Sequence, residues 1–103
     1  MKNHIYLVCY DIEKDYTRTK LADVLQRYGY ERIQYSIFVG IENPRSLPAL
    51  WNRIQVLIPL DKVGKDRIFV IRMRKQYLKK MLVIGQLNLD LAYICGDRHT
   101  LVI

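Results

Sequence analysis

The chain has 103 residues, of which 50% are hydrophobic and only five are glycine, and its formal net charge is +7. This length suits one compact domain over residues 1–103, and the composition excludes a disordered or low-complexity chain. The positive charge favours an anionic partner, most often nucleic acid, although charge that only keeps the protein in solution is the simpler alternative.

Several other protein classes are disfavoured. Cys9 and Cys95 form neither a CxxC pair nor a Cys/His cluster, which argues against a zinc site and a disulfide scaffold. The N-terminal run MKNHIYLVCYD lacks the pattern of a signal peptide, and no stretch approaches the ~18 apolar residues of a membrane span. We therefore expect a cytoplasmic protein with no membrane partner.

The first half of the chain predicts a strand, a helix and another strand. Residues 4–10 are apolar at both odd and even positions, as in a central strand covered on both faces. Residues 17–28 have the spacing of an amphipathic helix, with Asp15 or Thr17 as its cap and Gly29 as its left-handed stop. Residues 32–40 alternate as a strand.

The second half predicts a helix over residues 47–58 and a strand over residues 67–73. Ser46 is the expected cap of this helix, and Pro59 helps to end it. Weaker patterns follow: a helical turn at 76–81 and short strands at 82–84 and 99–103.

This order predicts an α+β fold of the ferredoxin-like type, βαββαβ, with both helices on one face of the sheet. The missing strand comes either from a hairpin that continues residues 32–40 through Glu42 or from the C-terminal pieces. Residues 82–103 form a tail with an extra strand that could pair with a partner subunit. Because the other sheet face is apolar, we expect a homodimer through it, with cover by the same chain's tail as the alternative.

An acid, Asp11, ends the first apolar run. A carboxylate at the end of a buried strand is costly unless it has a partner, such as a divalent ion, an arginine or backbone N–H groups. One such acid from each of two subunits could hold Mg²⁺ (or Mn²⁺) for attack on a phosphodiester. A strand-end aspartate that only bonds to local backbone is the simpler alternative.

Two groups of basic residues are candidates for nucleic-acid binding. Such residues contact phosphates, and these contacts carry no sequence information. The binding affinity then falls as the salt concentration rises. For any one exposed basic residue, a solvated surface position is an equal alternative. The first group comprises Arg18, Lys20, Arg27 and Arg32; the second lies within Lys62–Lys80 and includes Arg72, Arg74 and Lys75.

The order of several short motifs resembles the small CRISPR-associated spacer-acquisition protein, the smaller of the two universal adaptation proteins. That family's pattern is an apolar strand ending in YD, a basic helix, YG, and then R-x-Q-x-S-hydrophobic-F. The matching positions here are Tyr10, Asp11, Arg18, Lys20, Tyr28, Gly29, Arg32, Gln34, Ser36, Ile37 and Phe38.

The resemblance implies a ferredoxin-like homodimer whose C-terminal strand extends the partner's sheet. It implies that Asp11 is the catalytic magnesium ligand of an endonuclease acting on RNA or double-stranded DNA, and that the protein bridges dimers of the larger CRISPR integrase during spacer acquisition. The chain departs from the family in its short basic run after Asp11 and in its long segment Leu87–Arg98. A non-catalytic scaffold that positions DNA, or a related toxin-type ribonuclease, is the alternative function.

Overall fold

The computed structural model describes residues 3–59 and 64–86. The elements follow one another as β1 (His4–Asp11), α1 (Asp15–Arg27), β2 (Glu31–Gln34), β3 (Ile37–Gly40), the 3-10 helix η1 (Pro44–Ser46), α2 (Pro48–Leu57), β4 (Arg67–Arg74) and α3 (Lys75–Lys79). The predicted strand at 99–103, and the tail from residue 87 onward, lie outside the described residues.

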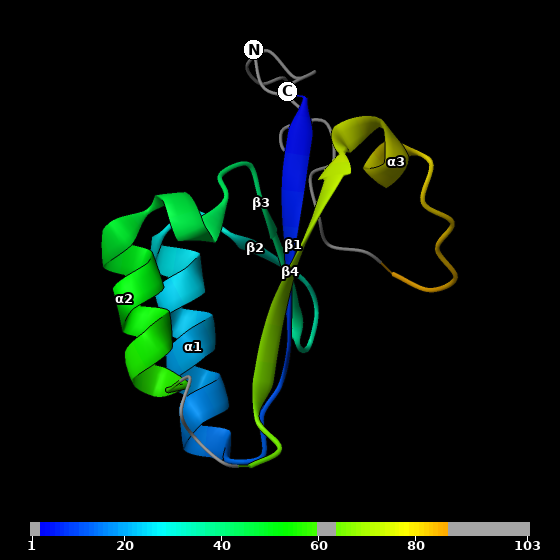
Figure 1. Cartoon of the computed structure of the whole chain (residues 1–103). Helices are drawn as coiled ribbons and strands as arrows, with labels where there is room; N and C mark the ends of the chain where they lie inside the picture. The colour runs from blue at the N-terminus through cyan, green and yellow to red at the C-terminus, as the bar shows by residue number, and fades with distance from the viewer. Residues whose placement is uncertain (1–2, 60–63, 87–103) are drawn as a thin grey trace.

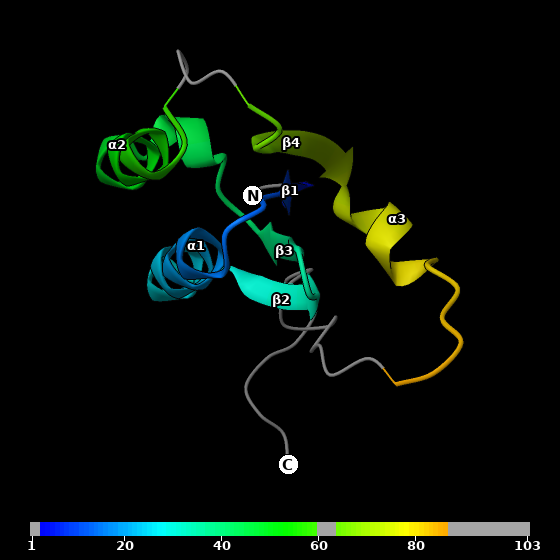
Figure 2. The same ribbon diagram turned by 90° about the horizontal axis from the view of Figure 1, so that it is seen from below.

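The four strands form one antiparallel sheet in the order β2-β3-β1-β4. β1 is central, as predicted, with Leu7 paired to Val39 of β3 and to Ile71 of β4. The helices α1 and α2 lie together on one face of the sheet, and α3 lies on the other (Figure 1, Figure 2). This is the βαββαβ arrangement of the ferredoxin-like fold, and the predicted fold class is confirmed.

The single strand predicted over residues 32–40 is wrong. The segment forms a hairpin, β2 and β3, that turns at Tyr35 and Ser36 rather than through Glu42. Gln34 pairs with Ile37 across a shifted register, and the Ser36 carbonyl accepts a 3.1 Å hydrogen bond from the Tyr10 N–H. The hairpin supplies the strand that the ferredoxin-like order needs, so the C-terminal pieces are not required for it.

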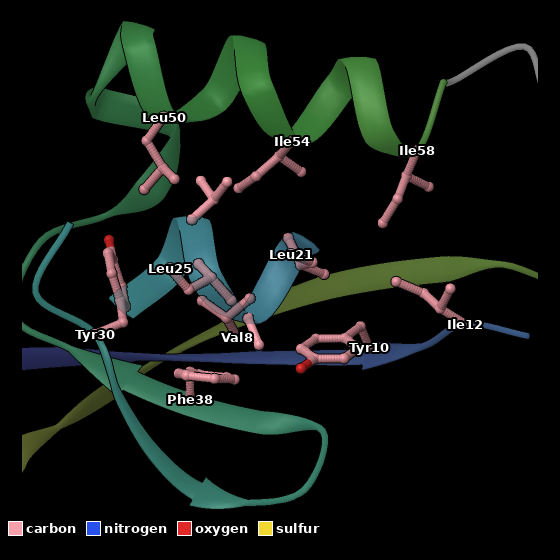
Figure 3. Packing of buried hydrophobic residues seen from close by; sticks show 12 residues of the cluster. Val8, Tyr10, Ile12, Leu21, Leu25, Tyr30, Phe38, Leu50, Ile54 and Ile58 are labelled. Carbon is pink, nitrogen blue, oxygen red and sulfur yellow. The ribbon is translucent and has the colours of Figure 1, made fainter. Parts of the chain in front are cut away.

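The main core lies between the sheet and the pair α1 and α2 (Figure 3). The ring of Tyr10 stacks on that of Phe38, with 6.2 Å between the centroids. Full burial of each large apolar side chain contributes roughly 1.5–3 kcal/mol. The side chains that are at most 2% exposed in this cluster are Val8, Leu21, Leu25, Phe38, Leu50 and Ile54.

The C-terminal end of α1 explains Gly29. Its φ is +90°, the left-handed region that glycine enters without strain. The Gly29 N–H donates to the Gln26 carbonyl at 3.1 Å, and the Tyr30 N–H donates to the Leu25 carbonyl at 3.0 Å. These two bonds form a Schellman motif, so the predicted role of Gly29 as the stop of the helix is confirmed.

The predicted N-terminal caps of both long helices are wrong. α1 begins at Asp15, and the preceding Lys14 makes no side-chain cap hydrogen bond. α2 begins at Pro48 after Leu47, because Ser46 is already used by η1, where its Oγ donates to the Asn43 carbonyl at 2.7 Å. Proline at the first helical position needs no N–H partner, so α2 can begin without a polar cap.

Gly40 ends β3 where the chain passes close to Tyr30. A Cβ at Gly40 would lie 2.4 Å from the Tyr30 ring, so no larger residue fits without displacing it. The Tyr30 hydroxyl donates to the Glu42 carbonyl at 2.5 Å, and burial raises the pKa of this phenol. The ring therefore fastens the end of α1 to the segment that leaves β3.

Among the residues that the structure describes, the second face of the sheet is covered at one end. There Leu78 of α3 packs against Ile5 and Val39. Farther along the same face, Phe69 and Ile71 of β4 are 51% and 43% exposed. The strand predicted at 82–84 is wrong: these residues form no strand, and Leu82 and Ile84 are exposed.

None of the helices in the described ranges has the length and apolar character needed to cross a membrane.

Candidate acidic site and nucleic-acid interface

Asp11 is the last residue of β1, and its side chain is exposed. It alternates with Ile5, Leu7 and Cys9, so it belongs to the sheet face opposite α1 and α2. Its register partner on β4 is Arg67, the first residue of that strand. The carboxylate thus stands at the tip of the central strand, on the incompletely covered face.

Asp11 has the chemistry of a ligand for a hard cation. Mg²⁺ is commonly held by one or two carboxylates and keeps several waters. Among residues 3–59 and 64–86, no group of three or more His, Cys, Asp or Glu residues is arranged to hold a metal ion. The described part of one chain therefore offers a partial site, which suits an ion shared between two chains or between the protein and a phosphate.

Arg18 holds the loop that follows Asp11. Its Nη1 donates to the carbonyls of Ile12 and Glu13 at 2.6 and 2.8 Å, and its other Nη pairs with Asp15. Its Nε is buried and has no hydrogen-bond partner in the described structure. Two of its nitrogens are thus engaged in fixing the path from β1 into α1, which makes Arg18 a positioning residue for the acidic strand end.

The rest of the first basic group does not form a uniform patch. Lys20 is exposed and lies 5.6 Å from the centroid of the Tyr16 ring. Arg27 pairs with Asp23 at 3.1 Å, one helical turn away. Arg32, on β2, is placed over the rings of Tyr35 and Phe38, at 5.6 and 5.1 Å from their centroids. Their predicted nucleic-acid contacts stay predictions.

Within the second basic group, Arg72, Arg74 and Lys75 lie toward the end of the β1–β4 pair that is remote from Asp11. Arg74 pairs with His4 and Arg72 with Tyr6, whereas Asp11 pairs with Arg67. At ~3.3 Å per residue, Arg67 and Arg74 are about 23 Å apart along β4. Arg74 and Lys75 line a hollow of about 280 Å³ with Asn3, Gln76 and Lys79. The structure therefore does not bring Asp11 together with Arg72, Arg74 or Lys75 within one chain, although Arg67 of the same basic region is its register partner.

The motif residues of the first 40 positions mostly build the fold. The Tyr10 hydroxyl donates to the Tyr35 carbonyl at 3.4 Å, and burial raises its pKa against the opposing effect of Arg32. Phe38 is fully buried, while Gln34 and Ser36 shape the hairpin. These positions frame Asp11 without supplying it with ligands.

One participant at the acidic end was not predicted from the sequence. The Asp66 carboxylate accepts a 3.0 Å hydrogen bond from the backbone N–H of Glu13. The two residues are far apart in the chain, and β1–β4 pairing brings them together. No local motif could have signalled this contact.

Comparison with known proteins gives a consistent family match. The family model described as "CRISPR associated protein Cas2" matches residues 4–81. The CRISPR-associated endoribonuclease Cas2 1 of Archaeoglobus fulgidus is 32% identical over 87 residues, which cover 84% of this chain and 89% of the relative.

Two further likenesses concern the fold and a fused relative. A crystal structure of a hypothetical protein from Thermus thermophilus superposes with a TM-score of 0.64 at 35% identity, covering 84% of this chain and 95% of the other. A fusion from Thermoproteus tenax, named CRISPR-associated endonuclease Cas1/endonuclease Cas2 fusion, is 42% identical over 52 residues, which cover 50% of this chain and 20% of the fusion.

Proposed function

The chain belongs to the CRISPR-associated Cas2 family of spacer-acquisition proteins, and from this premise we propose that it is a homodimer that binds nucleic acid and cleaves phosphodiester bonds with the help of a divalent ion at Asp11. The observation that carries the proposal is the exposed carboxylate at the tip of the central strand. It lies on the sheet face opposite α1 and α2, which we call the open face. Membership of this family favours the role over that of a toxin-type ribonuclease.

The open face supports the homodimer. Phe69 and Ile71 expose apolar surface there, and Leu7 and Cys9 are their register neighbours on β1. Contiguous apolar surface of this kind marks an interaction site. Because Asp11 belongs to the same face, a two-fold axis through this face would place two Asp11 carboxylates in one interface.

Asp11 is the residue that would hold Mg²⁺ or Mn²⁺. Its exposure leaves room for the waters and the phosphate oxygens that complete the shell of such an ion. When bound, the ion supplies Lewis-acid stabilisation of the charge that develops on the phosphodiester. The chain's own contribution is to fix the carboxylate: β1 pairs with strands on both sides, and Arg18 ties down the next loop.

Nucleic acid, either double-stranded DNA or RNA, is the proposed substrate. The net charge of +7 and the exposed residues Arg72 and Arg74 suit phosphate contacts. The distance between these residues and Asp11 calls for a ligand long enough to reach both, or for a second subunit that brings its own basic end nearby.

The larger CRISPR integrase is the proposed protein partner. The Thermoproteus tenax relative carries Cas1 and Cas2 in one fused chain by its name, which supports a close association of the two activities. A non-catalytic role, in which the dimer only positions DNA for the integrase, is favoured by the lack of a complete set of metal ligands in the described chain.

Cleavage and integration assays separate the two roles. We would incubate RNA and duplex DNA with the protein in Mg²⁺, Mn²⁺ or chelator, and compare wild type with Asp11→Asn. Cleavage that needs both the ion and Asp11 supports the nuclease. Undiminished cleavage by Asp11→Asn would rule the site out, and spacer integration that survives the substitution would favour the scaffold.

A further inference from the structure

A pocket of about 300 Å³ lies between α1 and the β2–β3 hairpin. Its walls include Arg18, Ala22 and Gln26 from α1 and Tyr10, Arg32 and Tyr35 from the strands and the hairpin turn. Its lining residues on α1 place the pocket on the sheet side that this helix covers (Figure 1), whereas Asp11 belongs to the opposite face. It is therefore a separate site from the acidic strand end.

The pocket carries positive charge. Asp23, the acid of the wall, is paired with Arg27 at 3.1 Å, and Arg18 is paired with Asp15, so the available positive charge of the pocket is that of Arg32. Arg18 is fixed by the two carbonyls that it binds. Arg32 is exposed, and its Cζ lies 5.6 and 5.1 Å from the ring centroids of Tyr35 and Phe38. Its guanidinium group also interacts with the Tyr10 hydroxyl, and the remaining N–H groups can donate to an anion such as phosphate.

Tyr35 adds an aromatic surface beside this charge. It sits in the hairpin turn with 67% of its surface exposed, although a turn position does not require an aromatic residue. Exposed aromatic rings next to cationic groups are the platforms on which nucleic-acid bases stack. The pocket thus offers a cationic donor for a phosphate and a ring for a planar base.

We propose that this pocket binds one nucleotide unit, with the phosphate at Arg32 and the base against Tyr35. Its volume is at the small end of the ~300–1,000 Å³ range of ligand pockets, which suits one unit rather than several. The same chemistry is offered by a free nucleoside monophosphate and by the phosphorylated end of a strand. In the second case the inference rests on the proposed nucleic-acid binding and adds that strand ends are recognised apart from Asp11.

Titration calorimetry with AMP, adenosine and inorganic phosphate tests the pocket. Wild type is expected to bind AMP at least tenfold more tightly than either fragment. Tyr35→Ala is expected to weaken AMP binding about tenfold and to leave phosphate binding unchanged. Arg32→Gln is expected to weaken both about tenfold or more. Arg45→Gln, which removes one exposed charge outside the pocket, is the control and should bind as wild type does.

Single-stranded DNA oligonucleotides with a 5′-phosphate or a 5′-hydroxyl separate the two sources. If strand ends are the ligand, the phosphorylated oligonucleotide binds at least tenfold more tightly and competes with AMP. If free nucleotides are the ligand, AMP binds and the two oligonucleotides do not differ.

The inference is overturned if AMP does not bind at millimolar concentration, or if Arg32→Gln and Tyr35→Ala bind it as wild type does. Thermal unfolding checks the fold of each variant, and the exposed Tyr35 provides a test even if Arg32→Gln does not fold. Duplex binding and cleavage are measured on the same preparations. If AMP does not bind while the duplex is still bound and cleaved, the pocket proposal is wrong and the proposed function stands. If AMP binds while the duplex is neither bound nor cleaved, the proposed function is wrong and the pocket proposal stands.

Discussion

The two faces of the sheet are covered to different degrees by the described part of the chain. On one face, α1 and α2 cover a core in which Phe38, Leu21 and Leu25 are fully buried. On the other, α3 covers Ile5 and Val39, while Phe69 and Ile71 stay about half exposed. The first face is complete within a single chain, and the second is the one that carries Asp11. The difference indicates that stability is provided mainly by one face and that the proposed assembly and chemistry use the other.

The largest expected effect comes from the acid of the open face. Asp11→Asn keeps the size of the side chain but removes the charge that would hold a divalent ion. We expect cleavage to fall at least about a hundredfold, with thermal unfolding unchanged because Asp11 is exposed. Rates of oligonucleotide cleavage in Mg²⁺ measure this. Glu31→Gln removes the same charge from β2 and should retain activity; an equal loss there would point to net charge instead of the site.

The apolar surface of the open face gives the next largest effect. Phe69→Glu would place a carboxylate in the proposed dimer interface, and we expect the dimer dissociation constant to rise about a hundredfold, with cleavage falling alongside it. Sedimentation equilibrium measures the association. Val56→Glu, at a 78% exposed position of α2, is the control. A wild type that is monomeric at micromolar concentration would contradict the dimer.

A more moderate effect is expected at the basic end of β4. The double substitution Arg72→Gln and Arg74→Gln should weaken duplex binding about tenfold and lower the slope of log K against log salt by about two. Fluorescence anisotropy across a salt series measures both values. Arg45→Gln should lower the slope far less. A wild type whose affinity does not depend on salt would argue against phosphate contacts.

The smallest effect is expected from Tyr30, in the core on the face that α1 and α2 cover. Because burial raises the pKa of Tyr30, the folded chain keeps the phenolic proton where the unfolded chain, with a pKa near ~10, loses it. Its contribution to stability is therefore present below about pH 10 and is lost as the pH rises further. Tyr30→Phe should cost ~1 kcal/mol at neutral pH and lessen the alkaline loss. Urea unfolding at pH 7 and above pH 10 tests this, with the exposed Tyr77→Phe as control.

Sequence patterns predicted most of the face that α1 and α2 cover, apart from the N-terminal caps of these two helices. The helical stripe of Leu21 and Leu25, the stop at Gly29 and the central position of β1 were all predicted and are confirmed. The hairpin was missed because the alternation of Ile33, Tyr35, Ile37 and Val39 runs through its turn without Gly, Asn or Asp. Tyr35 keeps the apolar period and yet is exposed in the turn.

The candidate site was less predictable because its parts meet only in three dimensions. The strand-end position of Asp11 followed from the first apolar run and is confirmed. The hydrogen bonds of Arg18 to the Ile12 and Glu13 carbonyls had no signal beyond a basic residue in a helix. The distance of Arg74 from Asp11 depends on the antiparallel register of β1 and β4, which composition cannot give.

The edge strand β4 has a consequence for handling the protein. In the part of the chain that the structure describes, β4 pairs only with β1, so one side of an eight-residue strand keeps an unpaired edge. Such edges template intermolecular strand addition and aggregation unless charged residues oppose it. Arg67, Arg72 and Arg74 can act as gatekeepers along β4, so polyanions or high salt that mask their repulsion should promote precipitation of the purified protein.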